Sequence, residues 1–101
     1  MAKVKITVLK KLKTDEVFRE YAAESMEAEC SRIGPIGKEY IADFEMPEGF
    51  CSWAWADIHR DVIHLALGGD FPWMKQNGMI ISACTDGLRP VLFKLERVEE
   101  S

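Results

Sequence analysis

The chain has 101 residues, of which 48% are hydrophobic and 30% are charged, and its formal net charge is −4. This length and composition predict one folded domain over residues 1–101 and exclude a disordered chain. The acidic balance argues against a dedicated nucleic-acid-binding protein. No apolar run approaches the roughly 20 residues of a membrane helix, and residues 1–13 lack a signal-peptide core. We therefore expect a cytoplasmic protein with no membrane partner, and three cysteines fit that compartment.

The first elements expected along the chain are a strand and a helix. Residues 3–8 alternate Lys or Thr with Val or Ile, which predicts a strand with one buried face. Thr14, Asp15 and Glu16 supply capping chemistry for a helix that we expect to run to about Glu29. Apolar residues at three- and four-residue spacing predict one buried stripe on this helix. The stripe consists of Val17, Phe18, Tyr21, Ala22 and Met26.

A short strand at residues 39–44 precedes a second helix at residues 51–67, which ends at Gly68-Gly69. The apolar residues of this helix fall on two sides, so we expect it to be buried on both, within the fold or against a second subunit. One side carries Cys51, Ala54, Trp55, Ile58, Val62 and Leu65, and the other carries Trp53, Ala56, Ile63 and Leu67.

Residues 79–84 and 91–98 predict a C-terminal hairpin that turns at Asp86-Gly87, with Pro90 at the start of its second strand. The order β-α-β-α-β-β predicts an α+β fold: a four-stranded, largely antiparallel sheet with two helices on one face. The apolar loop at residues 71–74 and the two-sided helix also predict a homo-oligomer, because isolated apolar patches rarely face water.

Cys51 is the leading candidate for a catalytic residue. It lies at the expected first turn of the second helix, where backbone amides and the helix dipole favour a thiolate. The alternative is a small buried hydrophobe, which is the commoner role of a free cysteine. Asp86 is a candidate partner in catalysis, although its position before Gly87 equally fits a turn former.

Two further kinds of site are open. Cys30, Cys51 and Cys84 could together hold zinc or an iron–sulfur cluster, but the gaps between them are long and no Cys-x-x-Cys motif is present. A small-molecule ligand could instead bind among tryptophans and a carboxylate, although the same aromatic residues also suit a core or a subunit interface. The residues of this ligand site would be Trp53, Trp55, Trp73 and Asp57.

Two stretches, at residues 47–54 and 84–93, each combine Cys, Gly and Pro at fixed offsets. They resemble motifs of a family of short, uncharacterised prokaryotic proteins, and the likeness extends over nearly the whole chain. The resemblance implies cytoplasmic residence, often in anaerobes, and a role for Cys51 and Cys84, but no activity. The family pattern places a Gly-His after its first cysteine, whereas this chain has Gly34-Pro35 there.

Two functions are therefore compared. The first is a thiol- or metal-dependent protein, with enzymatic activity left open, acting through Cys51 and Cys84. The second is a non-catalytic binding or interaction module with a tryptophan-lined pocket. The first function requires that Cys51 and Cys84 face one common cavity.

Overall fold

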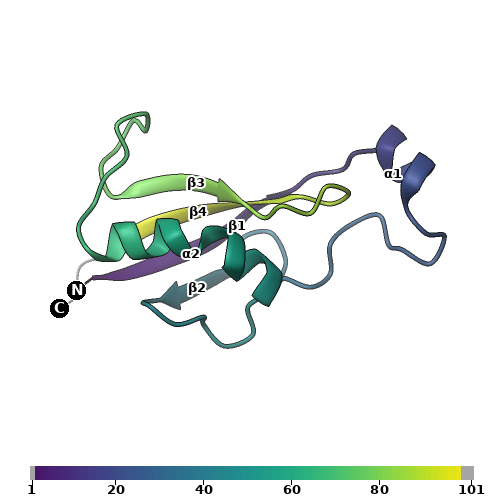
Figure 1. Ribbon diagram of the computed structural model, residues 1–101. Coiled ribbons are helices and arrows are strands. Elements are labelled where there is room, and N and C mark those ends of the chain that lie inside the picture. Colours follow the sequence, from purple (N-terminus) through teal and green to yellow (C-terminus); the bar gives the residue numbers. More distant parts are fainter. Residues whose placement is uncertain (1, 99–101) are drawn as a thin grey trace.

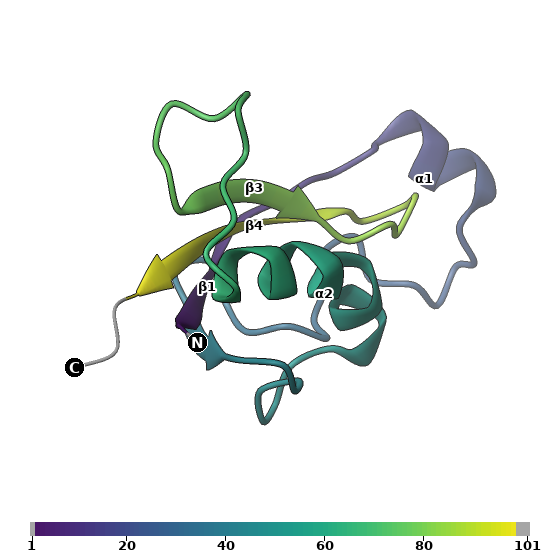
Figure 2. The same ribbon diagram turned by 60° about the vertical axis from the view of Figure 1, so that its left-hand side comes forward.

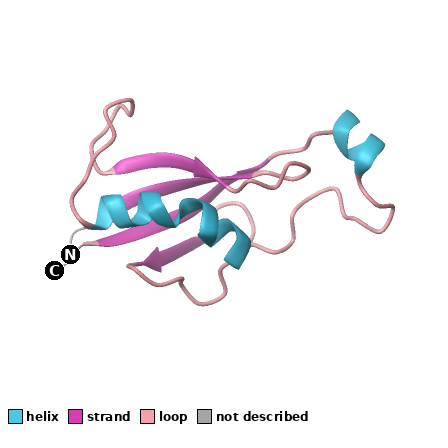
Figure 3. Ribbon diagram, viewed as in Figure 1, coloured by secondary structure: helices cyan, strands magenta, loops and turns pink. Residues whose placement is uncertain are grey.

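The computed structural model describes residues 2–98 as a four-stranded sheet with two helices (Figure 1, Figure 3). The strands are β1 (Lys3–Lys11), β2 (Glu39–Ala42), β3 (Met79–Ala83) and β4 (Val91–Val98), and the helices are α1 (Glu16–Tyr21) and α2 (Ser52–Ala66). The predicted α+β class, the order of the elements and the C-terminal hairpin are confirmed.

The sheet has the strand order β2-β1-β4-β3, and every neighbouring pair is antiparallel. The first and last strands of the chain are therefore the central ones. Ile6 pairs with Leu95 and Val8 with Phe93, and all four side chains are fully buried. This arrangement follows from the period-2 alternation of the two strands, which places one apolar row on a single face.

Helix α2 covers this apolar face (Figure 2). Ile58, Val62 and Leu65 are fully buried at spacings of three and four residues, so they form one stripe that packs on the sheet. Burial of each such side chain stabilises the fold by about 1.5–3 kcal/mol. The helix begins after Cys51 and ends before Leu67, close to the predicted bounds.

The other apolar side of α2 is not buried within the chain. Trp53 is 60% exposed and Leu67 is 68% exposed, Ala56 is also exposed, and Ile63 is half-buried. The prediction of burial on both sides within the fold is therefore wrong, because the helix has the sheet below it and no second layer above it among residues 2–98. Burial of this side against a second subunit stays a prediction.

Helix α1 is shorter than predicted and contributes no residue to the core. It ends at Tyr21 rather than near Glu29, because Ala22 is extended, and none of its residues is buried. Val17 and Tyr21, from the expected stripe, are 47% and 72% exposed. The helix lies beyond the end of the sheet, and α2 is the helix that packs on the sheet (Figure 1). Within residues 2–98, neither helix has the length and apolar character needed to cross a membrane.

Candidate functional site

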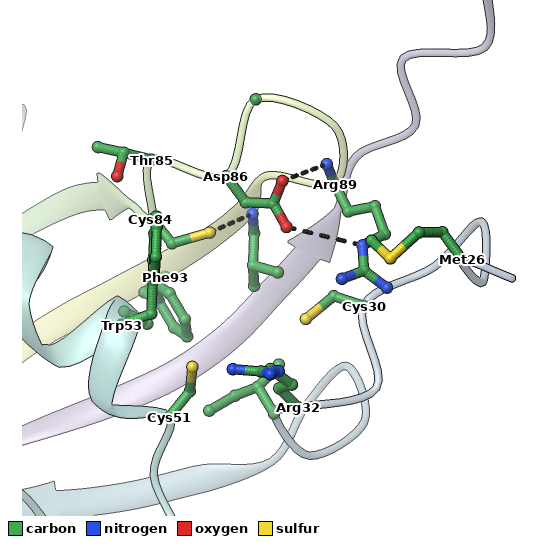
Figure 4. A pocket seen from close by; sticks show the side chains of 14 residues that line it. Met26, Cys30, Arg32, Cys51, Trp53, Cys84, Thr85, Asp86, Arg89 and Phe93 are labelled. Atoms are coloured by element: carbon green, nitrogen blue, oxygen red, sulfur yellow. Dashed lines mark hydrogen bonds and ion pairs between the residues drawn. The ribbon is translucent and has the colours of Figure 1, made fainter. Parts of the chain in front are cut away.

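A cavity of about 350 Å³ lies where the start of α2 meets the β3–β4 loop, and all three cysteines of the chain line it. Cys51 directly precedes α2, Cys84 follows β3, and Cys30 comes from the irregular segment at residues 22–38. Cys51 and Cys84 thus line one cavity, as expected, and Cys30 lines it as well. Val91 and Phe93 of β4 form part of the wall, and Figure 4 shows Phe93 between the Cys84 and Cys51 sides.

Cys51 is the N-cap residue of α2. Its backbone is extended, with φ −74° and ψ 123°, and its carbonyl oxygen accepts the first helical hydrogen bond from the Trp55 amide at 2.9 Å. Its side chain makes no capping hydrogen bond, so the first-turn amides are not satisfied by the sulfur. The thiol is half-buried and points into the cavity (Figure 4).

Cys84 is held more firmly than Cys51. It is 8% exposed, and its sulfur accepts a hydrogen bond from the Val91 amide at 3.3 Å. Its own amide donates to the Val91 carbonyl oxygen at 3.1 Å, which closes the hairpin loop at its base. These two bonds fix the position of the sulfur relative to β4. The sulfur is therefore a preorganised part of the wall, with less exposure than Cys51.

A β-bulge in β1 supplies the side chain that holds the Cys30 segment. The pairing of β1 with β4 shifts between Val8 and Lys10, so that Lys11 comes to lie opposite Val91. The extra residue reverses the alternation of the strand, and Lys11 rather than Lys10 faces the side that carries α2. Lys11 Nζ then donates to the Cys30 carbonyl oxygen at 2.8 Å.

Asp86 organises the loop that carries Cys84. Its Oδ1 accepts hydrogen bonds from the amides of Leu88 at 2.9 Å and Arg89 at 3.2 Å, and its Oδ2 lies 3.6 Å from Arg89 Nε. The loop spans residues 84–90, within one residue of the gap expected between the two strands. The side-chain bonds stabilise this loop, because they satisfy two of its backbone amides. Asp86 therefore acts as the turn former that the sequence offered as the alternative to a catalytic role.

Two arginines complete the cavity wall. Arg89 is only 13% exposed at its side chain, and its Nη1 donates to the Glu27 carbonyl oxygen at 3.3 Å. Its buried Nε has no hydrogen-bond partner among residues 2–98. Arg32 is exposed, lines the same cavity and makes no hydrogen bond or ion pair with the part of the chain that the structure describes. The wall thus carries two guanidinium groups and one carboxylate.

The structure does not gather the predicted ligand-binding residues into one pocket. Trp53 lines the cysteine cavity, but Trp55 packs edge-on against Phe50, and Trp73 lies in a separate groove beside β3. Asp57 accepts hydrogen bonds from the Thr85 amide at 2.7 Å and from its hydroxyl at 3.0 Å. It therefore ties α2 to the hairpin loop, and its carboxylate is already satisfied.

A preformed metal centre is also not found. Although the three cysteines share one cavity, no group of three His, Cys, Asp or Glu side chains within residues 2–98 lies close enough to hold one ion. Zinc–sulfur bonds are near 2.3 Å, so three thiolates would have to converge on a single point. Here the Cys84 sulfur is held at the start of β4 by the Val91 amide instead. The geometry does not fit the expected zinc or iron–sulfur site of Cys30, Cys51 and Cys84.

Comparison of the chain with protein-family models, with curated proteins and with solved structures gave no match. The assignment of function therefore rests on the site alone. Sequence reasoning missed Lys11, Arg32 and Arg89, which shape and charge the cavity. Only Lys11 has a local signal, since it belongs to a run of lysines, and such a run is more typical of a solvated strand face.

Proposed function

We propose that this protein acts through the thiols of the cysteine-lined cavity, with Cys51 as the reactive thiol and Cys84 as its neighbour. One observation carries the proposal: three segments far apart in the sequence bring every cysteine of the chain to the wall of one cavity. Cysteines that only filled separate parts of the core would have no reason to share a solvent-reachable wall.

The location of Cys51 supports this assignment. The thiolate is the reactive form of cysteine, and it is favoured at helix N-termini and beside cationic groups. Cys51 occupies the N-cap of α2, and Arg32 and Arg89 line the same cavity. Asp86 is proposed as a positioning residue rather than a catalytic one, because its Oδ1 already accepts two loop amides.

The free state of the three thiols also supports a reducing location. None of the cysteines is in a disulfide. Thiols persist in this form in the cytoplasm, where glutathione and thioredoxin keep them reduced. We therefore propose that the protein works in the cytoplasm and that its cavity is accessible to a small molecule there.

Rates of alkylation test the proposal. Native protein purified without oxygen is treated with iodoacetamide, and the modification of each cysteine is followed by peptide mass spectrometry. We expect Cys51 to react at least about tenfold faster than Cys84, and faster than a cysteine in an unfolded control peptide. Equal rates for Cys51 in the folded protein and in the peptide would contradict the proposal. Elemental analysis of the same sample adds a check, since stoichiometric zinc or iron would contradict a metal-free thiol site.

A binding module without thiol chemistry is the second candidate, and the size of the cavity favours it. A volume of about 350 Å³ falls at the lower end of the range for small-molecule sites. Trp53 and Phe93 give this cavity an aromatic wall. An unreactive Cys51 together with a bound small molecule would favour this candidate over the first.

A further inference from the structure

The charges around the cysteine cavity do not balance. Asp86 is the carboxylate of the wall, and it is engaged by two loop amides and by the neighbouring Arg89. Arg32 remains without a partner among residues 2–98. While Cys51 is a neutral thiol, the cavity therefore carries an excess of positive charge on a chain whose net charge is −4. An anion would complete this charge pattern.

A second, independent feature points the same way. The α2 helix has 15 residues and begins at the cavity, where Cys51, Trp53 and Ala54 belong to the wall. Its N-cap side chain makes no capping hydrogen bond, so first-turn N–H groups at the positive end of the helix dipole lie beside the cavity without that partner. Figure 4 shows the Cys51 sulfur and the Arg32 guanidinium turned toward the same space.

Arg89 adds a constrained donor. Its side chain is 13% exposed and is anchored at Nη1 by the Glu27 carbonyl oxygen at 3.3 Å. Its Nε lies 3.6 Å from Asp86 Oδ2, which is too long for a hydrogen bond. The guanidinium is thus held at the wall by groups that leave part of its donor capacity unused. Unused donors of a buried guanidinium are costly, and an anionic oxygen would offset that cost.

The rest of the wall sets the size and character of the ligand. The volume of about 350 Å³ fits a small molecule. The side chains of Ile33, Val91 and Phe93 are buried and apolar, and the Trp53 ring stands at the rim. One unpaired guanidinium matches one negative charge. A planar or short apolar body with a single carboxylate satisfies both parts of the wall.

We infer that the cysteine cavity binds a small organic monocarboxylate, whose carboxylate is held by Arg32, Arg89 and the first-turn amides of α2 and whose body lies against Phe93 and Trp53. The inference names the ligand class of the site to which we assign thiol function, and it rests on that proposed function for its biological meaning. The binding step itself needs no thiol chemistry.

The test is a titration followed by ¹H–¹⁵N NMR with benzoate as the probe. We expect millimolar benzoate to shift the amide resonances of residues 52–54 and the indole resonance of Trp53, while benzamide, its neutral isostere, leaves them unchanged. Arg32→Gln should weaken benzoate binding about tenfold, which is the usual size of a lost charge-assisted hydrogen bond. Arg60→Gln is the matched control, since Arg60 is exposed and lies in α2 outside this cavity.

Equal shifts with benzoate and benzamide, or unchanged benzoate binding by Arg32→Gln, would overturn the inference. Shifts with inorganic phosphate but none with benzoate would overturn the assignment to a carboxylate. The same titration of Cys51→Ser separates this inference from the proposed function. Benzoate binding should persist in that variant. If the wild-type protein binds benzoate but its Cys51 is alkylated slowly, only the thiol proposal is contradicted. If the wild-type protein does not bind benzoate, only the monocarboxylate inference is contradicted.

Discussion

Lys11 shows how a single side chain builds the wall of the cavity. It reaches from the end of β1 to the Cys30 carbonyl oxygen at 2.8 Å and to the Ile33 carbonyl oxygen at 3.5 Å. The segment at residues 22–38 has no strand or helix of its own, so such bonds take the place of regular structure in holding it. The position of Cys30 therefore depends on a residue that lies 19 positions earlier in the chain.

We predict that Lys11→Ala loosens the Cys30 segment. Loss of the ammonium group leaves both carbonyl oxygens without this donor, so the segment should open more often and Cys30 should be alkylated several times faster. Lys10→Ala is the matched control, because Lys10 lies next to Lys11 but is exposed on the opposite face of the sheet. Native alkylation with peptide mass spectrometry measures both. Identical Cys30 rates in the two variants would contradict this role of Lys11.

A second prediction at this scale concerns Asp70 and pH. A hydrogen bond from Arg97 at 2.9 Å, followed by one from the Gly78 amide, holds the pKa of Asp70 below its ordinary value of 3.8. Because the folded state binds this proton less tightly than the unfolded state, the stabilisation is fully present above a pH of about 4. It is lost as the pH falls through the lowered pKa.

Urea unfolding of Asp70→Asn and the wild type at several pH values measures this effect. The variant should be less stable near neutral pH, and the difference should shrink as the pH falls below about 4. Glu24→Gln, at an exposed position in the irregular segment, is the control and should show no such trend. A constant difference between Asp70→Asn and the wild type over the whole pH range would show that the charge of Asp70 is not the cause.

At the scale of elements, the two helices differ although their apolar spacing is similar. Residues 16–26 and 51–67 both carry apolar residues at three- and four-residue spacing, and both patterns predicted buried helices. Only α2 lies over the sheet. The spacing shows that each helix has an apolar stripe. Which of the two stripes packs on the one apolar face of the sheet depends on tertiary packing. The strands, by contrast, could be predicted well, because the apolar row of each strand lies within one paired sheet.

Leu65 and Leu67, at the end of α2, allow the effect of burial to be measured on two neighbouring leucines. Leu65 is fully buried against the sheet, whereas Leu67 is 68% exposed. Leu65→Ala should lower the free energy of unfolding by about 2–5 kcal/mol, which is typical of a buried leucine. In the monomer, Leu67→Ala should change it by no more than about 0.5 kcal/mol. Urea denaturation at a protein concentration low enough to keep the chain monomeric gives both values, and similar losses for the two variants would contradict this difference in burial.

For the candidate site, the sequence was informative where residue type alone carries the chemistry. Cys51 and Cys84 could be selected because thiols are rare and reactive, and the helix start at Cys51 could be predicted from the apolar pattern that follows it. Arg32 and Arg89 could not be selected, because an arginine is ordinary on any surface. Their importance follows from the path of residues 22–38, which is fixed by long-range contacts such as that of Arg89 with the Glu27 carbonyl oxygen.

At the scale of the whole molecule, an apolar surface remains uncovered beside β3. We call it the α2–β3 surface and define it by four side chains that line one groove. Leu67 and Trp73 are 68% and 71% exposed, Ile81 is 40% exposed, and Ile63 is half-buried. β3 is also an edge strand of the sheet, with backbone groups on its outer side free to pair. Such an edge beside exposed apolar side chains is typical of an association surface.

We predict that two copies associate through the α2–β3 surface. Antiparallel pairing of one edge strand with its copy would make a closed, symmetric dimer and would bury these side chains in both subunits. Light scattering at micromolar concentration should report about twice the mass of the 11.5 kDa chain. Ile81→Lys should return it to the monomer, because a charge would be buried in the contact. Ile41→Lys, on the exposed face of the opposite edge strand β2, is the control. A wild-type monomer would contradict the prediction.

The three thiols share one cavity, and shielding of one thiol by another tests this arrangement most directly. Cys51 is first capped with N-ethylmaleimide, and the alkylation rates of Cys30 and Cys84 are then measured by peptide mass spectrometry. The reference is Cys51→Ser, in which residue 51 is unreactive but the cavity stays open. The added group should fill much of a cavity of about 350 Å³, so both thiols should react about tenfold or more slowly in the capped protein than in the reference. Equal rates in the capped protein and in Cys51→Ser would contradict the shared cavity.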